Sequence, residues 1–376
     1  MKKRIAVLGA TGSIGKITLE ILRNQKESFE PVLFTAYKNA TELEKLKQEF
    51  PCAQFVLGSE GLLEAIACCG ADIIVNGISG AAGLLPSVAA IKAGSDLALA
   101  NKETVVMAGR LVLDLAREKN VKIIPVDSEH SALFKLIEAH GRENVSEIIL
   151  TASGGPFRNF TREKLKTVTP KEALAHPTWK MGPKISIDSA TMANKGLEVI
   201  EASILFGFSP DQIKVTIHSQ SIVHSMIRLK NRAVYAQMSN PDMRMFIHDT
   251  LTWPETRCSP FGSATTGSLD FDSLSLSFER YDPEKFPMLE LAYKALKTKD
   301  PLMPVVYNAA NEVAVEAFFQ GQIGFLEIST LVGYVMEKSF PETEEPLSIQ
   351  EVLARDRKAR EITEELLRLG VTNADI

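Results

Sequence analysis

Two carboxylates separated by one serine directly follow an apolar run in the stretch Ile123–His130. If that run is a strand, Asp127 and Glu129 lie at its carboxyl end, where open α/β sheets place their ligands. Carboxylate oxygens with open water positions suit Mg²⁺ or Mn²⁺. The alternative is a helix start, with Asp127 or Ser128 as the N-cap and Glu129 as a favourable charge in the first turn. The residues alone leave both interpretations open.

A second polar stretch, Asp188–Glu198, has the pattern of a capped helix start. Asn194 and Lys195 stand four and three residues before Glu198, so the three side chains can share one helix face. The plain alternative is an exposed Lys–Glu pair contributing ~0.3 kcal/mol. Gly196 in mid-helix costs ~1 kcal/mol relative to alanine, which is easier to understand where another group must approach closely.

Two loops could complete a site. The stretch Ser153–Pro156 follows a β-rich run and predicts either a phosphate-binding turn or an ordinary turn. The loop 175–183 is bounded by proline and glycine and carries Trp179, one of two tryptophans. An aromatic side chain there indicates a lid that excludes water, or a tryptophan packed under an ordered loop.

Alternating strand and helix patterns must position these residues. Strand-like runs separated by helical spacing up to about Ala152 predict a parallel, doubly wound sheet. Thr41 and Glu44 suggest a capping box for one of the helices, and Glu103–Lys119 has helical apolar spacing. The predicted strands are Arg4–Leu8, Val32–Ala36, Gln54–Leu57, Asp72–Asn76, Asp96–Leu99, Lys122–Val126 and Glu147–Thr151.

The first strand leads into the turn Gly9–Gly15, which has the spacing G-x-x-G-x-x-G and opens a helical pattern. Glycines let the backbone approach a pyrophosphate, and the helix N-terminus offers free N–H groups, so we expect a dinucleotide site in preference to a plain tight turn. The second strand ends at Tyr37 and Lys38 without a carboxylate. A lysine there favours NADP over NAD, unless Lys38 is only a solvated surface residue.

Two other strand ends, Asn76–Gly80 and Ala100–Glu103, should lie on the same edge of the sheet. Lys102 could contact a substrate oxygen there, or pair with Glu103 near a helix start.

The region from about Asn144 to Arg257 predicts a second sheet, with strands at Ile148–Thr151, Lys184–Ile187, Lys214–His218, Ile222–Leu229 and Ala233–Met238. Ser259–Ser277 is rich in serine, glycine and threonine and is typical of a linker or extended arm. Helical patterns then follow at Pro287–Leu296, Val305–Phe319, Phe325–Met336 and Ile349–Leu369. Asn308, Asn311 and Glu312 share a helix face, where we interpret them as interior hydrogen-bonding residues.

The composition argues against nucleic acid and membranes as partners. A net charge of -5 and a pI near 5.8 give no basic surface for nucleic acid or anionic membranes. No segment approaches the ~20 apolar residues of a membrane span. The four cysteines form no C-x-x-C pair, which indicates a reducing, cytoplasmic location and buried, inert thiols.

Several motifs together resemble the 1-deoxy-D-xylulose 5-phosphate reductoisomerase family, over nearly the whole chain. The motifs are Gly9–Gly15, Ala100–Glu103, Asp127–His130, Thr151–Pro156, His176–Gly182, Asp188–Glu198, Pro241–Arg244 and Asn308–Glu312. The resemblance implies NADPH- and metal-dependent rearrangement and reduction of 1-deoxy-D-xylulose 5-phosphate to 2-C-methyl-D-erythritol 4-phosphate, in non-mevalonate isoprenoid synthesis. It also implies a homodimer.

The resemblance also implies roles for single residues. It makes Asp127, Glu129 and Glu198 the ligands of one Mg²⁺ or Mn²⁺. The expected phosphate ligands are Ser153, Ser189, Asn194 and Lys195, with His176 nearby. Lys102 and Ser128 lie beside the substrate backbone, Trp179 and Met181 belong to the lid, and Met243 flanks the nicotinamide. The expected cofactor contacts are Thr11, Gly12, Ser13, Ile14, Tyr37, Lys38, Asn39, Asn101, Glu103 and Gly182, with Tyr37 standing where the family often has glycine.

We therefore expect a Rossmann-like NADPH domain at 1–126, an α+β catalytic domain with its own sheet at 127–258, a linker at 259–280 and a helical domain at 281–376. Two alternatives to the reductoisomerase remain. A non-catalytic NADP-binding sensor would have no need for three convergent carboxylates. A dehydrogenase of the aspartate-semialdehyde type would need an active-site cysteine, and none of the four has a catalytic-looking setting.

Overall fold

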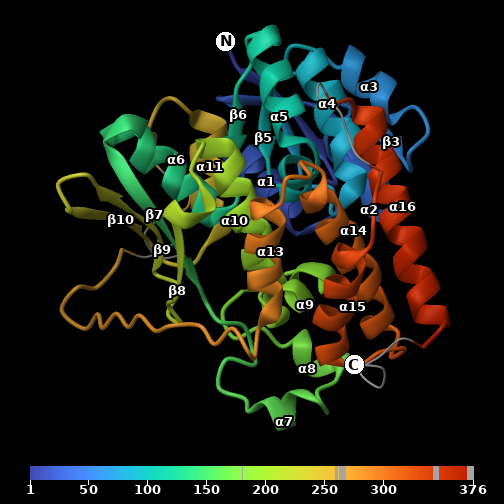
Figure 1. The fold of residues 1–376 in the computed structure, drawn as a ribbon. Coiled ribbons are helices and arrows are strands. Elements are labelled where there is room, and N and C mark those ends of the chain that lie inside the picture. The colour runs from blue at the N-terminus through green and yellow to red at the C-terminus, as the bar shows by residue number, and fades with distance from the viewer. Residues whose placement is uncertain (180, 259–260, 262–267, 342–346, 371–376) are drawn as a thin grey trace. The chain divides into compact units, whose positions relative to one another are not determined.

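The computed structural model describes residues 1–179, 181–258, 261, 268–341 and 347–370 (Figure 1). Lys180 of the predicted lid and part of the predicted linker lie outside the described residues. By internal contacts the chain forms two compact units. Unit 1 comprises residues 1–104, 112–139 and 237–274, and unit 2 comprises 105–111, 140–236 and 275–376.

Unit 1 contains a six-stranded parallel sheet in the order β3-β2-β1-β4-β5-β6. This is the strand order of a Rossmann fold, as predicted, with a switch point between β1 and β4. The strands are β1 Lys3–Leu8, β2 Phe29–Ala36, β3 Gln54–Leu57, β4 Ile73–Asn76, β5 Asp96–Leu99 and β6 Ile123–Pro125.

Helices follow the strands of unit 1. They are α1 Ser13–Asn24, α2 Ala40–Glu49, α3 Leu62–Cys68, α4 Leu84–Lys92, α5 Lys102–Lys119, α6 Ser128–His140 and the later helix α11 Met243–Thr252; residues 105–111 of α5 and the last residue of α6 belong to unit 2. The predicted capping box at Thr41 is wrong. Helix α2 already begins at Ala40, so Thr41 lies inside its first turn and Asn39 is its N-cap. The Asn39 side chain accepts a hydrogen bond of 3.1 Å from the backbone N–H of Glu42.

Unit 2 contains a mixed sheet of four strands in the order β10-β9-β7-β8. β7 pairs parallel to β8 and antiparallel to β9, so the run at Glu147–Thr151 belongs to this sheet and not to the first. The strands are β7 Val145–Ala152, β8 Ile213–Ile217, β9 Val223–Leu229 and β10 Val234–Met238, the last two residues of which belong to unit 1.

The predicted strand at Lys184–Ile187 is wrong: these residues belong to helix α9, Pro183–Thr191. Gly182 is the N-cap and Pro183 takes the first helical position, where its missing N–H costs nothing. Lys184 then lies one turn from Asp188 and forms an ion pair of 3.0 Å with it. The alternation Lys-Ile-Ser-Ile imitates a strand, but the helix start chemistry before it decides the local structure.

The remaining helices of unit 2 include four long ones that match the predicted C-terminal helices, drawn in orange and red in Figure 1. Helix α14 contacts α13, α15 and α16, and α10 contacts α13. The helices are α7 Arg162–Leu165, α8 Pro170–Ala173, α10 Ala193–Phe206, α13 Pro287–Lys297, α14 Met303–Phe319, α15 Phe325–Glu337 and α16 Ile349–Arg368.

Gly196 lies where α10 packs against its neighbours. A Cβ at this position would meet the Tyr307 hydroxyl at 2.5 Å and the Ala292 Cβ at 2.9 Å. The close approach expected from the glycine is therefore real, and the approaching groups are α13 and α14. This contact fixes α10, which carries the polar side chains of the candidate site.

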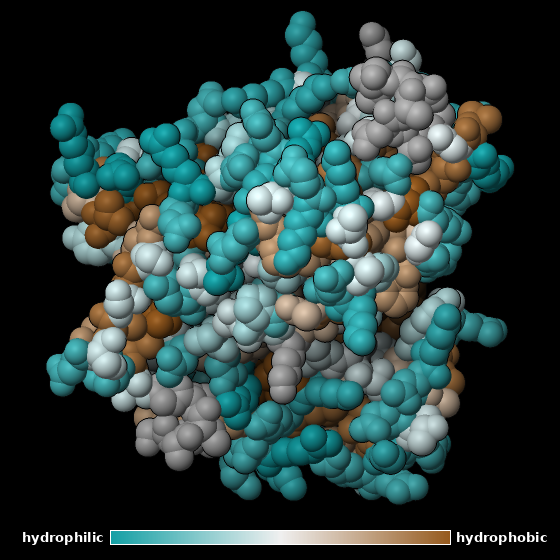
Figure 2. All heavy atoms as spheres, turned by 90° about the horizontal axis from the view of Figure 1, so that it is seen from below, coloured by the Kyte–Doolittle hydropathy of each residue, from teal (hydrophilic) through white to brown (hydrophobic). Residues whose placement is uncertain are grey.

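The surface is mainly hydrophilic on the face drawn in Figure 2, where hydrophobic side chains form separate patches. Among the described residues, no helix is long and apolar enough to cross a membrane.

Candidate active site

The first part of the candidate site lies at the carboxyl edge of the sheet in unit 1. Strand β6 ends at Pro125, and Asp127 follows just before α6. The ammonium of Lys102, at the start of α5, forms an ion pair of 2.5 Å with Asp127 Oδ2. The Ser128 hydroxyl donates to Glu129 Oε2 across 2.6 Å. The structure therefore brings Lys102, Asp127, Ser128 and Glu129 to one sheet edge.

Helix capping and ligand binding are compatible for Asp127. Its backbone carbonyl accepts the N–H of Ser131 at 2.8 Å, which is the first hydrogen bond of a helix. Its carboxylate meanwhile faces Lys102 and lies 3.9 Å from the buried His130 ring. The Asp127 backbone therefore takes the N-cap position of α6, while its carboxylate pairs with Lys102.

The glycine turn after β1 is built for a close approach. Gly9 has φ +78°, and α1 begins at Ser13 with Gly12 as an N-cap that offers no side-chain hydrogen bond. A Cβ at Gly15 would lie 2.4 Å from the Gly9 carbonyl oxygen, so the helix packs directly on the turn. The first N–H groups of α1, including those of Ser13 and Ile14, therefore have no capping side chain and suit an anion.

The residues that follow β2 are exposed. Tyr37 is 70% exposed and the Lys38 ammonium lies 5.3 Å from its ring centre. Asn39 caps α2, as described above. An exposed cation at this strand end can meet a 2′-phosphate without a desolvation cost.

The side chain of Asn101 holds the surrounding backbone in place. Its side-chain N–H groups donate to the backbone oxygens of Ile78 at 2.7 Å and Gly80 at 2.9 Å, and to Glu103 at 3.0 Å. Its side-chain oxygen caps α5 through the N–H of Thr104. One buried amide thus ties the loop after β4 to the start of α5, and it fixes the two strand ends that the sequence predicts on one edge.

Met243 opens helix α11, and it packs against the hydrophobic core of unit 1. The adjacent Arg244 is paired with Asp242 at 2.6 Å and with Glu20 of α1 at 3.4 Å. These ion pairs hold the start of α11 against the helix that follows the glycine turn.

The second part of the candidate site lies in unit 2, on helix α10. Asn194 donates to Glu198 Oε1, and Lys195 forms an ion pair with Glu198 Oε2. The predicted shared face is therefore present. The alternative of an exposed pair is wrong, because the side chains of Lys195 and Glu198 are only 5% and 1% exposed. A buried ion pair is weak support for stability, since desolvation offsets the attraction, and this favours a functional role.

The junction between α9 and α10 differs from the predicted helix start at Asp188. Asp188 and Ser189 lie in the last turns of α9, and Met192, with φ +64°, breaks the helix before α10 begins. Thr191 accepts the N–H of Ala193 at 3.2 Å. The break sets Ser189 near the end of one helix and Asn194 at the start of the next.

The turn after β7 packs on this junction. Gly155 has φ +67°, and a Cβ there would lie 2.6 Å from the backbone oxygen of Ser189. Ser153, two residues earlier, lies 3.0 Å from His176 Nε2. Three chain segments predicted to bind phosphate therefore meet inside unit 2.

The predicted lid begins at His176. Its Nδ1 accepts the backbone N–H groups of Thr178 at 3.2 Å and Trp179 at 2.9 Å. Trp179 is half-buried, and its ring makes a T-shaped contact with the ring of His224, with the ring centres 6.4 Å apart. Burial lowers the pKa of His176 below its ordinary value, and the nearby Arg158 lowers it further. Met181 and Gly182 close the loop, Gly182 as N-cap of α9.

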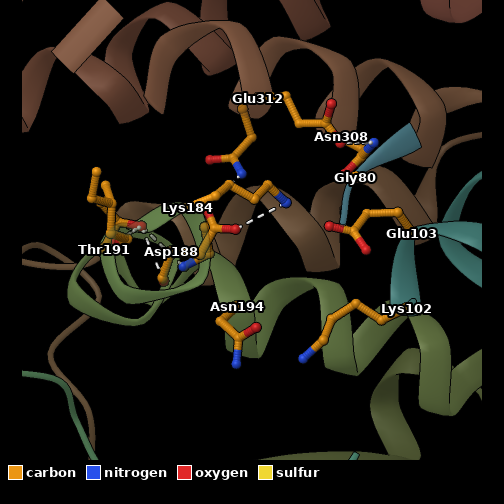
Figure 3. A network of polar contacts seen from close by, with 12 residues as sticks. Gly80, Lys102, Glu103, Lys184, Asp188, Thr191, Asn194, Asn308 and Glu312 are labelled. Atoms are coloured by element: carbon orange, nitrogen blue, oxygen red, sulfur yellow. Dashed lines mark hydrogen bonds and ion pairs between the residues drawn. The ribbon is translucent and has the colours of Figure 1, made fainter. Parts of the chain in front are cut away.

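Polar side chains of α9 and α14 form a network, of which Figure 3 shows Lys184, Asp188 and Glu312. Asp188 pairs with Lys184 on its own helix and accepts a hydrogen bond of 2.8 Å from Asn311 of α14. On the same face of α14, Glu312 pairs with Arg360 at 2.7 Å. The interior hydrogen-bonding role expected for this face is confirmed. The sequence does not show that Asp188 is its partner, because the two residues lie 123 positions apart.

Models of one family match most of the chain. The 1-deoxy-D-xylulose 5-phosphate reductoisomerase model matches residues 5–57 and 51–109, its C-terminal domain model matches 123–206, and the DXP reductoisomerase C-terminal domain model matches 238–362.

Individual relatives agree with these models. The chain is 46% identical to 1-deoxy-D-xylulose 5-phosphate reductoisomerase of Treponema denticola, with 96% of each chain covered, and 45% identical to that of Pelodictyon phaeoclathratiforme, with 97% and 100% covered. A solved structure of the Zymomonas mobilis reductoisomerase with NADPH matches with a TM-score of 0.88 at 38% identity, covering 98% of this chain and 99% of that one. A reductoisomerase structure with NADPH, fosmidomycin and magnesium matches with a TM-score of 0.88 at 34% identity, covering 98% of each.

Proposed function

The chain belongs to the 1-deoxy-D-xylulose 5-phosphate reductoisomerase family, and we propose how its own residues carry out that family's reaction. The enzyme is an NADPH- and divalent-metal-dependent oxidoreductase and isomerase. It rearranges and reduces 1-deoxy-D-xylulose 5-phosphate to 2-C-methyl-D-erythritol 4-phosphate for isoprenoid synthesis. This membership favours the reductoisomerase over a non-catalytic sensor and over a cysteine-dependent dehydrogenase.

The observation that carries the residue assignment is the meeting of three segments in unit 2. Gly155 backs onto Ser189, Ser153 contacts His176, and Asn194 and Lys195 follow the helix break. Hydroxyl, amide and ammonium donors at one place suit a phosphate monoester. We assign the substrate phosphate to Ser153, Ser189, Asn194 and Lys195, with His176 beside them. Phosphate binding energy, obtained away from the reacting carbons, orders a small flexible sugar.

The cation is assigned to Asp127, Glu129 and Glu198. Three carboxylates are hard oxygen donors, and this donor set fits Mg²⁺ or Mn²⁺. The bound cation supplies Lewis acidity toward the ketone and hydroxyl oxygens of the substrate. Lys102 and Ser128 adjoin these carboxylates and are assigned to the substrate backbone, where the Lys102 ammonium can stabilise negative charge that develops on oxygen.

The NADPH site follows the carboxyl edge of the first sheet. The pyrophosphate is assigned to the start of α1, the 2′-phosphate to Lys38, and one side of the nicotinamide to Met243. The full set of proposed cofactor contacts is Thr11, Gly12, Ser13, Ile14, Tyr37, Lys38, Asn39, Asn101, Glu103 and Gly182. Since the side chain of Asn101 is committed to the scaffold, its contact with the cofactor is assigned to its backbone.

Trp179 and Met181 are assigned to a lid over the substrate. Expulsion of water strengthens each charge interaction inside the site. The loop 175–183 contains His176, which contacts Ser153, and Gly182, the N-cap of α9, so a movement of the lid acts directly on the proposed phosphate site.

We keep a functional division into an NADPH domain at 1–126, a catalytic domain at 127–258, a linker at 259–280 and a helical domain at 281–376. A homodimer in the cytoplasm completes the proposal.

An NADPH oxidation assay tests the assignment. The expected result is loss of absorbance at the reduced nicotinamide band with 1-deoxy-D-xylulose 5-phosphate and Mg²⁺ or Mn²⁺, and no turnover after chelation. The same sugar without its phosphate is the control and should react far more slowly. Turnover that is independent of both metal and phosphate would contradict the proposed site.

A further inference from the structure

The position of one proton follows from the hydrogen bonds of His176. Its Nδ1 accepts two backbone N–H groups, from Thr178 at 3.2 Å and from Trp179 at 2.9 Å. A ring nitrogen that accepts a hydrogen bond carries no proton, and a neutral imidazole then carries its proton on the other nitrogen. His176 is therefore an Nε2–H donor.

That donor fixes the hydroxyl of Ser153. His176 Nε2 lies 3.0 Å from Ser153 Oγ, and the Gly155 N–H donates to the same oxygen at 3.2 Å. A serine hydroxyl has two acceptor positions and one proton to donate. Both acceptor positions are filled, and no residue in the described part of the chain accepts the Ser153 proton. The hydroxyl is left as a donor only.

We propose that His176 is a positioning residue that stays neutral, holds the Ser153 hydroxyl as an obligatory donor to the substrate phosphate, and couples that donor to the lid residues 178 and 179. The inference rests on the proposed function, in which Ser153 binds the phosphate. A donor-only hydroxyl favours a dianionic oxygen over water or a sugar hydroxyl, because it has nothing left with which to accept. The backbone turn at residues 178 and 179 therefore contributes to specificity for a phosphate monoester, because it fixes the proton of His176 on Nε2.

The surroundings of His176 agree with a neutral ring. Arg158 is the charged group that faces it among the described residues, and both burial and this cation disfavour imidazolium. Protonation of Nδ1 would set its N–H against two backbone N–H groups. Acidification should therefore release the turn at residues 178 and 179 and weaken phosphate binding together.

Nitrogen NMR of the imidazole in the full-length wild-type enzyme tests the tautomer directly. At about pH 7 we expect an unprotonated Nδ1 resonance and a protonated Nε2 resonance for His176, with or without inorganic phosphate. Two protonated nitrogens, or the proton on Nδ1, would overturn the inference. This measurement needs no variant and no turnover.

Two substitutions separate the two hydrogen bonds of the ring. In His176→Asn, the amide oxygen can replace Nδ1 as acceptor, so the lid turn is kept while the donor to Ser153 is lost. In His176→Gln, the amide N–H can replace Nε2, so the donor is kept while the turn is lost.

The two variants should differ in fluorescence and in KM. With Trp253 replaced by Phe, we expect unchanged Trp179 emission in His176→Asn and shifted emission in His176→Gln. The KM for the phosphorylated ketose should rise about 10-fold to 100-fold in the first, with a smaller rise in the second. The opposite ranking would count against the inference.

The combination with Ser153→Ala distinguishes failure of the inference from failure of the proposed function. If His176 acts through Ser153, the effect of His176→Asn on KM should disappear in the Ser153→Ala background. Additive effects would mean that His176 meets the phosphate itself, which overturns the inference alone. An unchanged affinity for inorganic phosphate and substrate in Ser153→Ala would instead overturn the phosphate assignment.

Discussion

The side-chain amide of Asn311 donates a hydrogen bond of 2.8 Å to the carboxylate of Asp188, which joins α14 to the helix that carries Ser189. Asp188 is buried, and its other oxygen pairs with Lys184. The residue next to a proposed phosphate ligand is therefore held from two helices. The position of Ser189 therefore depends on α14 as well as on α9.

Replacement of Asn311 by Leu should weaken both stability and phosphate binding. The change leaves a buried carboxylate oxygen without its donor, at a cost of about 1 to 3 kcal/mol in unfolding free energy. Because α9 loses its support, the KM for the sugar phosphate should rise more than kcat falls. Urea unfolding and steady-state kinetics measure the two effects.

Asn308→Leu is the matched control on the same helix. Its amide donates to Glu312 at 3.2 Å and not to Asp188, so KM should stay near the wild-type value.

Gly155→Ala tests the packing of the phosphate turn on Ser189. The new Cβ would lie 2.6 Å from a backbone oxygen, so the turn must move away from the helix junction. Gly207→Ala is the control, since Gly207 has φ +68° but open space around its Cβ. We expect the control to lose about 1 kcal/mol from the backbone conformation alone and to keep its KM. Gly155→Ala should lose more stability and also bind inorganic phosphate more weakly, as measured by calorimetry. Equal losses in the two variants would argue against a tight contact.

Glu198→Gln should abolish metal-dependent turnover. The amide has half the acceptor capacity and no charge, so it removes the carboxylate that pairs with the buried Lys195 ammonium. NADPH binding, followed by cofactor fluorescence, should remain, because the proposed cofactor contacts lie elsewhere. Glu316→Gln on the exposed face of α14 serves as the control and should be fully active. A fully active Glu198→Gln enzyme would disprove the metal assignment.

Lys38→Asp should shift the cofactor preference from NADPH toward NADH. A carboxylate at the end of β2 repels the 2′-phosphate and can accept from a ribose hydroxyl. We expect the KM for NADPH to rise about 10-fold, as for loss of one charge contact of about 1.4 kcal/mol. Lys119→Asp, at the far end of α5, should leave both cofactor KM values unchanged. If Lys38 is only a surface residue, the two variants will behave alike.

Acid should destabilise the protein through His176 and His248. Burial lowers the pKa of His248, whose ring lies 3.0 Å from Gln25, and burial likewise lowers the pKa of His176. If these histidines stay neutral in the folded state, the unfolding free energy has its full value above the ordinary histidine pKa of ~6.5. Below that pH the unfolded chain gains protons, so the unfolding free energy falls until the folded pKa is passed, by at most about 1.4 kcal/mol per pH unit for each histidine.

Urea unfolding at about pH 8 and about pH 5.5 measures this loss. His248→Gln removes one of the two groups, so the difference between the two pH values should shrink in that variant. An undiminished difference would assign the acid sensitivity to other groups.

Most of the fold follows from local patterns. Gln54–Leu57 and Asp96–Leu99 were predicted to the residue, because short β-rich runs between turn residues have few alternatives. The failure at Lys184–Ile187 is instructive, since four alternating residues carry less information than the Gly182–Pro183 start before them. The break at Met192 had no sequence signal at all, because a left-handed methionine is held by tertiary packing.

The site could be predicted only in part, for a similar reason. Spacing placed Asn194, Lys195 and Glu198 on one face, but their burial depends on the packing of distant helices. The link between Ser153 and His176 and the link between Asp188 and Asn311 join residues far apart in the chain. No local pattern contains such pairings.

The lysines paired with Asp127 and Glu198 have a consequence for the enzyme between turnovers. Each carboxylate already has an ammonium partner, Lys102 in one case and Lys195 in the other. Removal of the proposed cation would therefore leave each of these two acids with a positive partner, and the loss in unfolding free energy should not exceed the loss of the metal binding energy. A divalent cation held by the proposed carboxylate ligands would compete with these ammonium groups and would leave them able to pair with the substrate anion. Under the proposed site assignment, binding of the metal and binding of the substrate would therefore be thermodynamically linked through Lys102 and Lys195.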